Sequence, residues 1–302
     1  MSLRKSVARL AAGWRSLTKA VAERRHVLAK VGLRAAAAGA LVLIVLLIHR
    51  SVYMAVISSP EFRIPKNLAR ANVAPSWADP SAPESVVTLP AGRASLLDPD
   101  LVHNVAASFE ANPWVRRVIA VERLFPDQVR VRLEMRAVRL AVRRPGGYIL
   151  VDREGVRLPG AYERAPKAAM EVVGAAGVPP VAGRTWEGAE IAAALELASV
   201  AEGEAFLRGL NLRMVDVSNV NGRRDPQAPE LGLVTASGSV IGWGRAPSAA
   251  RFGEPSIGEK LDNLRRTAEN YPRLEGVAVV KVHQKGPARV RLMETGVVRK
   301  PK

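Results

Sequence analysis

The 302-residue chain contains no cysteine, which excludes disulfide bonds, thiolate metal sites and a cysteine nucleophile. Histidine is scarce, and the four histidines are not spaced from one another as zinc ligands are. They are His26, His49, His103 and His283. Aromatic residues make up 5% of the chain and do not alternate with basic residues, so the sequence does not favour nucleic-acid binding. We expect neither a metal nor another cofactor.

Motifs of catalysis are also missing. The chain has no Gly-x-Ser-x-Gly, no phosphate-binding glycine loop and no His-Glu-x-x-His. Ser16-Leu17-Thr18-Lys19 has the Ser-x-x-Lys spacing of serine acyl-enzymes, but the Ser-Asp-Asn and Lys-Thr-Gly motifs that accompany it are absent. Chance explains this match. We therefore expect a protein without catalytic activity whose function is recognition.

Acidic residues are the minority, with 28 Asp and Glu against 45 Lys and Arg, and the net charge of +17 favours anionic partners. The bias is strongest in residues 1–34, where Glu23 is the only acid among nine basic residues. Apolar residues recur in this segment at helical spacing. Two interpretations remain open: a helix lying on anionic lipid, and a disordered basic tail.

One long hydrophobic run follows the basic segment. Residues 35–48 carry no charge, and residues 52–57 are mostly apolar after His49-Arg50. The uncharged run is shorter than the roughly 20 residues of a bilayer span, and taken alone it is compatible with a signal peptide. The long basic segment and the lack of a cleavage site favour a retained transmembrane helix, which we assign to residues 35–57. The side chains of Arg34 and Arg50 can reach the headgroup layers on opposite sides, which lengthens the usable span. This span includes Ala35, Gly39, Leu43 and Leu47.

The positive charge before the span predicts that residues 1–34 are cytoplasmic and that the rest of the chain is exported. Residues 58–85 contain five prolines, which is typical of an extended linker. A strand at 86–89 is followed by a helix that Asp98 or Asp100 caps and whose inner face holds Leu101, Val105 and Phe109. Further strands are expected near 118–122, 129–136 and 148–151. The prediction is an α+β fold.

Strict alternation between Val129 and Arg136 predicts a strand with one apolar and one charged face. Arg130, Arg132 and Arg136 form the basic row of this strand, which is either a solvated face or a binding site for an acidic partner. The second half of the chain predicts two helices, at 190–201 and around Leu261 and Leu264. Strands are predicted at 212–217, 231–236, 239–243, 277–283 and 288–293.

Four motifs carry a resemblance to a known family. They are Asn-Pro-Trp-Val at 112–115, Val-x-Arg-x-x-Pro at 121–126, Glu-Met-Arg-Ala-Val at 134–138 and Tyr-Ile-Leu-Val-Asp-Arg-Glu-Gly-Val at 148–156. They resemble the POTRA module of the bacterial cell-division protein family FtsQ, also called DivIB. Residues 178–183 are similar to the motif that opens the family's second, β-rich domain. The resemblance implies a POTRA-like domain at 86–158, an FtsQ-type β domain at 159–295 and a short tail at 296–302.

The resemblance also implies a function. Members of this family are single-pass proteins of the bacterial inner membrane, enriched at the division septum, which link division components without catalysis. Their partners are FtsB and FtsL, and the expected mechanism is β-augmentation, in which the partner adds a strand to a free sheet edge. By order along the chain, the edge residues here are Ala288, Arg289, Val290, Arg291 and Leu292. The alternative is a POTRA-bearing component of an export or outer-membrane transport system.

Overall fold

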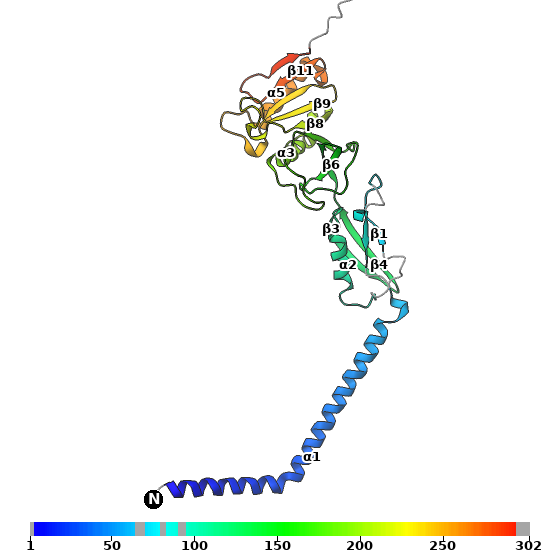
Figure 1. Cartoon of the computed structure of the whole chain (residues 1–302), viewed down its shortest axis with the longest axis vertical. Coiled ribbons are helices and arrows are strands. Elements are labelled where there is room, and N and C mark those ends of the chain that lie inside the picture. The colour runs from blue at the N-terminus through cyan, green and yellow to red at the C-terminus, as the bar shows by residue number, and fades with distance from the viewer. Residues whose placement is uncertain (1–2, 64–69, 79–82, 90–94, 294–302) are drawn as a thin grey trace, which may run out of the picture.

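A computed structural model describes residues 3–63, 70–78, 83–89 and 95–293. The chain begins with one long helix and continues into two folded bodies, which follow one another away from the helix (Figure 1). The first body, called here the hairpin module, comprises the described residues from 60 to 135. The second, called the sheet domain, comprises residues 138–293. The molecule is therefore a mixed α+β protein with an N-terminal apolar helix.

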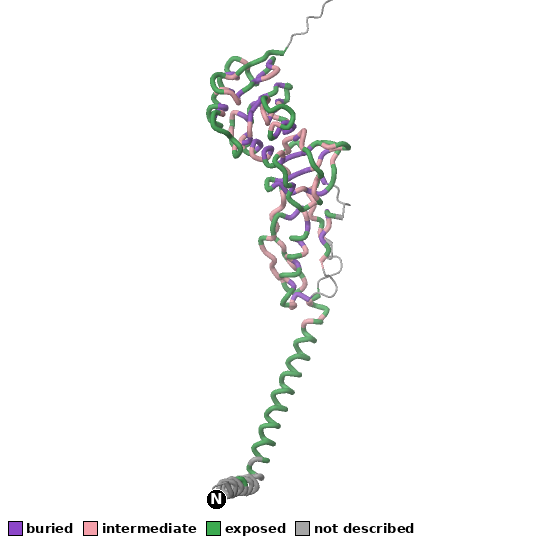
Figure 2. The backbone as a smooth tube through the Cα atoms, turned by 60° about the vertical axis from the view of Figure 1, so that its left-hand side comes forward, coloured by how far each residue is buried: buried purple, intermediate pink, exposed green. Residues whose placement is uncertain are grey.

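Helix α1 (Leu3–Ile57) is continuous through both the basic segment and the hydrophobic run, and it is bent along its length (Figure 1). Its part from Ala29 to Ile57 is long and apolar enough to cross a membrane. At 1.5 Å per residue these 29 residues extend about 43 Å, more than the roughly 30 Å of a hydrocarbon core. Every residue from Lys30 to Val56 is exposed (Figure 2). Ala35, Gly39, Leu43 and Leu47 all lie in this exposed part.

The hairpin module packs one helix against two pairs of antiparallel strands. Its elements are η1 (Pro60–Phe62), β1 (Arg70–Asn72), η3 (Pro83–Ser85), β2 (Val86–Thr88), α2 (Leu101–Glu110), β3 (Val115–Leu124) and β4 (Gln128–Met135). β1 pairs with β2, and β3 pairs with β4. Leu101, Val105 and Phe109 of α2 are buried, as the sequence predicts. They form a core with the apolar face of the hairpin, which includes Val129 and Val131.

Two expectations for this region need correction. Residues 70–72, expected within an extended linker, form β1 and pair with β2, because Ala71 packs into the module's apolar core. Asp100 stands at the N-cap position of α2, but its side chain makes no capping hydrogen bond. Asp98 instead accepts a hydrogen bond from the backbone of Asp100 at 3.0 Å, so the acids shape the turn before the helix.

The sheet domain is built on an eight-stranded mixed sheet in the order β12-β11-β10-β9-β8-β7-β5-β6. The strands are β5 (Val138–Arg144), β6 (Gly147–Asp152), β7 (Met170–Val173), β8 (Leu212–Asp216), β9 (Leu231–Thr235), β10 (Val240–Gly244), β11 (Val277–Lys281) and β12 (Arg289–Leu292). The other elements are α3 (Ala189–Gly203), α4 (Ala205–Gly209), η4 (Val220–Gly222), η5 (Pro247–Ala249), α5 (Ile257–Asn270) and η6 (Pro272–Leu274). The helices and strands predicted in this half of the chain are confirmed, with ends that shift by a few residues.

Both long helices of this domain bury their apolar residues on the sheet. Ile191 and Leu197 of α3 and Leu261 and Leu264 of α5 share one core with alternate residues of the strands, such as Val215. Leu195 of α3 is only partly buried against this core. The common core shows that the two helices cover the same face of the sheet.

The boundary between the two bodies differs from the expectation. Residues 138–158 were assigned to the POTRA-like domain, but β5 and β6 belong to the large sheet, because β5 pairs with β7 as well as with β6. The two bodies share a small apolar cluster in which Ala78 and Trp114 of the hairpin module contact Leu150 and Leu158. The bodies are therefore joined by packing as well as by the chain.

Candidate interaction site at the free edge of the sheet

The two edges of the large sheet differ. At one edge, Tyr148 of β6 exchanges backbone hydrogen bonds of 2.7 and 2.9 Å with Tyr162, so a loop covers that strand. At the other edge, β12 pairs with β11 on one side, and within the described residues no strand pairs with its other side. An uncovered strand presents backbone N–H and C=O groups to solvent, ready to pair with another chain. β12 is the candidate site.

The register of β12 fixes which side chains border this edge. Val290 pairs with Val280, and Arg289 and Arg291 pair with Lys281 and Val279. All four residues of β12 are exposed, including Val290 at 38% and Leu292 at 51%. The strand thus combines two exposed apolar side chains with two arginines.

The segment before β12 holds the strand in place. Ala288 packs against the main core, and the side-chain amide of Asn263 on α5 donates a hydrogen bond to the Gly286 carbonyl at 2.9 Å. Of the five predicted edge residues, Ala288 therefore anchors the strand, and Arg289 to Leu292 form it. The structure brings all five together at the edge.

Positive charge surrounds the edge. A shallow hollow of about 360 Å³ is lined by Val279, Lys281, Arg289, Val290 and Arg291. Within the described residues, Lys281, Arg289 and Arg291 make no ion pair with an acid. A partner strand with acidic side chains would therefore meet unpaired cations next to free backbone groups.

The predicted basic row on β4 is not a single surface. Arg130 and Arg132 are exposed and share Glu122 of β3, with N–O distances of 3.7 and 3.0 Å. Arg136 follows β4 and turns into the contact between the two bodies, where it binds Asp152. The structure therefore separates Arg136 from the other two, because the alternation of the strand ends at Met135.

A network of charges joins the two bodies at this point. Arg136 contacts Glu154 at 2.9 Å, and Arg116 of β3 bridges Glu154 and Glu134. Hydrogen bonds from Arg116 and Arg136 hold the pKa of Glu154 below its usual value, and those from Arg116 and Arg117 do the same for Glu134. Glu154 and Glu134 therefore stay ionised at neutral pH and keep their ion pairs with these arginines.

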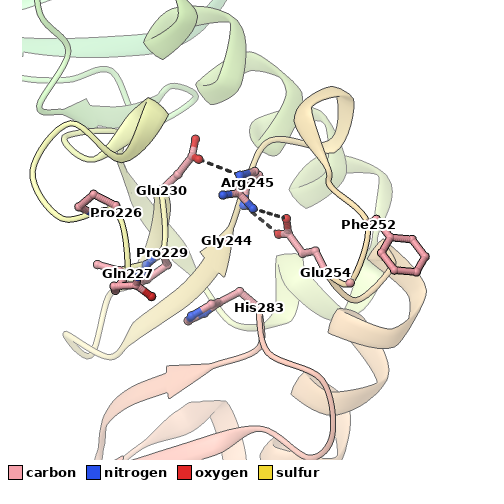
Figure 3. A pocket seen from close by; sticks show the side chains of 11 residues that line it. Pro226, Gln227, Pro229, Glu230, Gly244, Arg245, Phe252, Glu254 and His283 are labelled. Atoms are coloured by element: carbon pink, nitrogen blue, oxygen red, sulfur yellow. Dashed lines mark hydrogen bonds and ion pairs between the residues drawn. The ribbon is translucent and has the colours of Figure 1, made fainter.

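A second polar hollow lies in the sheet domain, where the end of β10 meets the loop before α5 (Figure 3). It has a volume of about 280 Å³, and its lining includes Glu230, Arg245, Glu254 and His283. Arg245 binds Glu230 at 2.8 Å and Glu254 at 3.5 Å. Glu254 also binds Lys260, whose side chain is 3% exposed, at 2.6 Å. Each charge in this hollow is thus matched by a neighbour.

The pKa values in the hollow follow from burial and these partners. Burial opposes ionisation of Glu254, but hydrogen bonds from Lys260 and from the backbone of Arg245 outweigh it and lower the pKa. Burial lowers the pKa of His283, and the hydrogen bond between its Nδ1 and the Gly242 carbonyl opposes this only in part. The imidazole is therefore neutral at pH 7, so Nδ1 donates this hydrogen bond.

Sequence reasoning missed this buried ion cluster. Lys260 precedes Leu261 on α5, and nothing in the sequence distinguishes it from a lysine on a solvated helix face. Glu254 lies in a loop nine residues from Arg245, a separation without a motif. In the part of the chain that the structure describes, no group of three or more acids and histidines is placed to hold a metal ion.

No protein-family model and no curated protein matches this chain.

Proposed function

We propose that the protein is a membrane-anchored, non-catalytic scaffold of the bacterial division machinery, which binds a partner strand along β12. The supporting observation is the position of this free edge. β12 belongs to the body farther from α1, at the opposite end of the molecule from the helix that is apolar enough to span a membrane (Figure 1). An interaction site so placed reaches partners away from the membrane surface.

The resemblance to the FtsQ family names the expected partners, FtsB and FtsL. In this proposal residues 1–34 are cytoplasmic, both bodies are exported across the inner membrane, and the protein is enriched at the septum. The POTRA-like part is the hairpin module, and the FtsQ-type part is the sheet domain. The edge residues Arg289, Val290, Arg291 and Leu292 contact the partner, and Ala288 holds the strand.

A proline substitution tests the edge directly. Val290→Pro removes a backbone donor from β12 and stiffens the strand, so FtsB should no longer co-purify with the full-length protein. Val178→Pro is the matched control, because Val178 is a highly exposed loop residue that already precedes a proline. Undiminished recovery of FtsB with Val290→Pro would contradict the proposed edge.

Localisation separates the proposal from the transport alternative. A fluorescent fusion of the full chain should form a band at mid-cell in dividing cells. An even distribution around the envelope would count against a role in division.

A further inference from the structure

The turn of the β3–β4 hairpin lies at the end of the hairpin module that faces α1 (Figure 1). It carries an exposed aromatic side chain. Phe125 in this turn is 62% exposed. Its ring contacts that of Phe62 edge to face, with a centroid distance of 6.3 Å. We call Phe62 and Phe125 the aromatic tip. A large exposed apolar group on a folded module is a candidate contact surface.

Short, ordered connections hold the aromatic tip near the end of α1. The helix ends at Ile57, so Phe62 follows within five residues, a reach of at most about 18 Å. Arg63 donates a hydrogen bond to the Ser58 carbonyl at 2.8 Å, which folds the connection onto the helix end. The Phe62 carbonyl accepts a hydrogen bond from buried Leu96 at 2.8 Å, which fixes the connection to the module.

The length of the apolar helix places its end at the membrane surface. Counted from Ala35, the first residue after Arg34, a hydrocarbon core of about 30 Å is crossed by Met54. Ile57 then lies about 5 Å farther out, in the headgroup layer. The aromatic tip lies within reach of that same layer.

We infer that the aromatic tip inserts into the headgroup layer of the membrane that α1 spans and seats the hairpin module on the bilayer. The charges at this end favour an apolar contact over recognition of anionic lipid. Among the described residues at this end, the acids Glu61, Asp98 and Asp127 outnumber the basic residues Arg63 and Arg123. Arg123 already donates hydrogen bonds to backbone carbonyls, of Asp98 at 2.7 Å and of Pro99 at 3.2 Å. Burial of phenylalanine in the interface supplies the attraction.

This inference rests on the proposed membrane anchoring by α1, and the experiment distinguishes the two. The chain lacks cysteine, so single cysteines can be labelled in the full-length protein. An environment-sensitive fluorophore is placed at Gln128→Cys, beside Phe125 in the hairpin, with the protein in nanodiscs of zwitterionic lipid. A nitroxide quencher is attached to the lipid headgroups or to the upper acyl chain.

Two other labelled positions serve as controls. Leu43→Cys reports on the apolar helix itself, with a quencher placed deep in the acyl chains. Arg251→Cys lies beside Phe252, a still more exposed aromatic residue in the sheet domain, far along the molecule from α1. It tests whether any exposed aromatic site attracts the label to lipid.

We expect the headgroup quencher to reduce the fluorescence of the label at Gln128→Cys and to leave that of the label at Arg251→Cys unchanged. Adding Phe125→Ser should shift the ratio of seated to unseated module about tenfold towards unseated, and the quenching should fall accordingly. The inference is overturned if Leu43→Cys is quenched while Gln128→Cys behaves like Arg251→Cys. If Leu43→Cys is not quenched either, the membrane anchoring itself is wrong.

Discussion

Arg136 and Asp152 meet at 2.6 Å across the contact between the two bodies, one directly after β4 and the other at the end of β6. The arginine side chain is 15% exposed, and the aspartate is buried. Asp152 also accepts hydrogen bonds from the backbone of Glu154 at 2.9 Å and of Val156 at 2.8 Å. This pair therefore connects the hairpin module to a turn of the sheet domain.

Arg136→Ala should destabilise the protein, because it leaves the buried carboxylate of Asp152 without its cation. Removing one partner of a buried ion pair costs about 3 kcal/mol. Denaturant unfolding of the two folded bodies in the full chain, followed by fluorescence, measures the change. Arg130→Ala is the control, because an exposed pair such as that with Glu122 contributes at most about 1 kcal/mol. Equal effects of the two substitutions would contradict this role of Arg136.

The buried ion cluster of Glu254, Arg245 and Lys260 predicts that the free energy of unfolding depends on pH in the acidic range. The pKa of Glu254 lies below its ordinary value of 4.5 in the folded protein, so the unfolded chain binds more protons between the two values. Its contribution to stability is complete above about pH 4.5 and is lost as the pH falls through the folded pKa. Glu254→Gln should flatten this part of the stability profile. Glu259→Gln would not serve as a control, because the pKa of Glu259 is also lowered in the folded protein.

His283 predicts a second pH range, at higher pH, in which stability changes. Burial lowers its pKa from 6.5, so the unfolded chain binds a proton that the folded chain does not. Stability should therefore fall as the pH decreases below about 6.5, until the folded pKa is reached. His283→Gln removes the titrating group, and thermal unfolding between pH 7 and pH 5 should then change less than in the unmodified protein. An unchanged slope would show that the imidazole is not responsible.

Two glycines allow strain and crowding to be compared. Gly244 has φ +99°, and a Cβ atom there would collide with the Glu254 carboxylate and with His283. Gly238 has φ +91°, and a Cβ atom there would meet nothing within 4 Å. Gly238→Ala should cost about 1 kcal/mol from strained backbone alone, and Gly244→Ala should cost more because the buried carboxylate must also move. Equal changes in the free energy of unfolding would contradict the close approach of Glu254.

Charge reversal tests the proposed partner site without changing the backbone. Arg289→Glu with Arg291→Glu should weaken binding of FtsB about tenfold and slow association, because both arginines lie beside the edge without an ion pair among the described residues. Arg130→Glu with Arg132→Glu is the matched control on β4. Binding kinetics at two salt concentrations measure the effect. A larger loss from the β4 pair would move the partner site to the hairpin module.

The sequence by itself determined the periodic features. The apolar residues 35–57 after a basic segment predict a membrane helix, and α1 includes a part long and apolar enough to cross a membrane. Strict alternation between Val129 and Arg136 predicts a strand whose apolar residues share one face, and β4 forms there but ends at Met135. Helix α3 and most strands of the sheet domain follow from the same local rules, since periodicity reflects which side of an element is buried.

Only the tertiary structure decided which strands share a sheet and which charges meet. Strands β5 and β6 follow the hairpin closely in sequence, but β5 pairs with β7 and β6 pairs with β5, so both join the large sheet through long-range packing. The pairing of Lys260 with Glu254 and the separation of Arg136 from Arg130 also depend on where distant segments meet. β12 is an edge because the strand order ends there, and strand order is a property of the assembled sheet that no local pattern encodes.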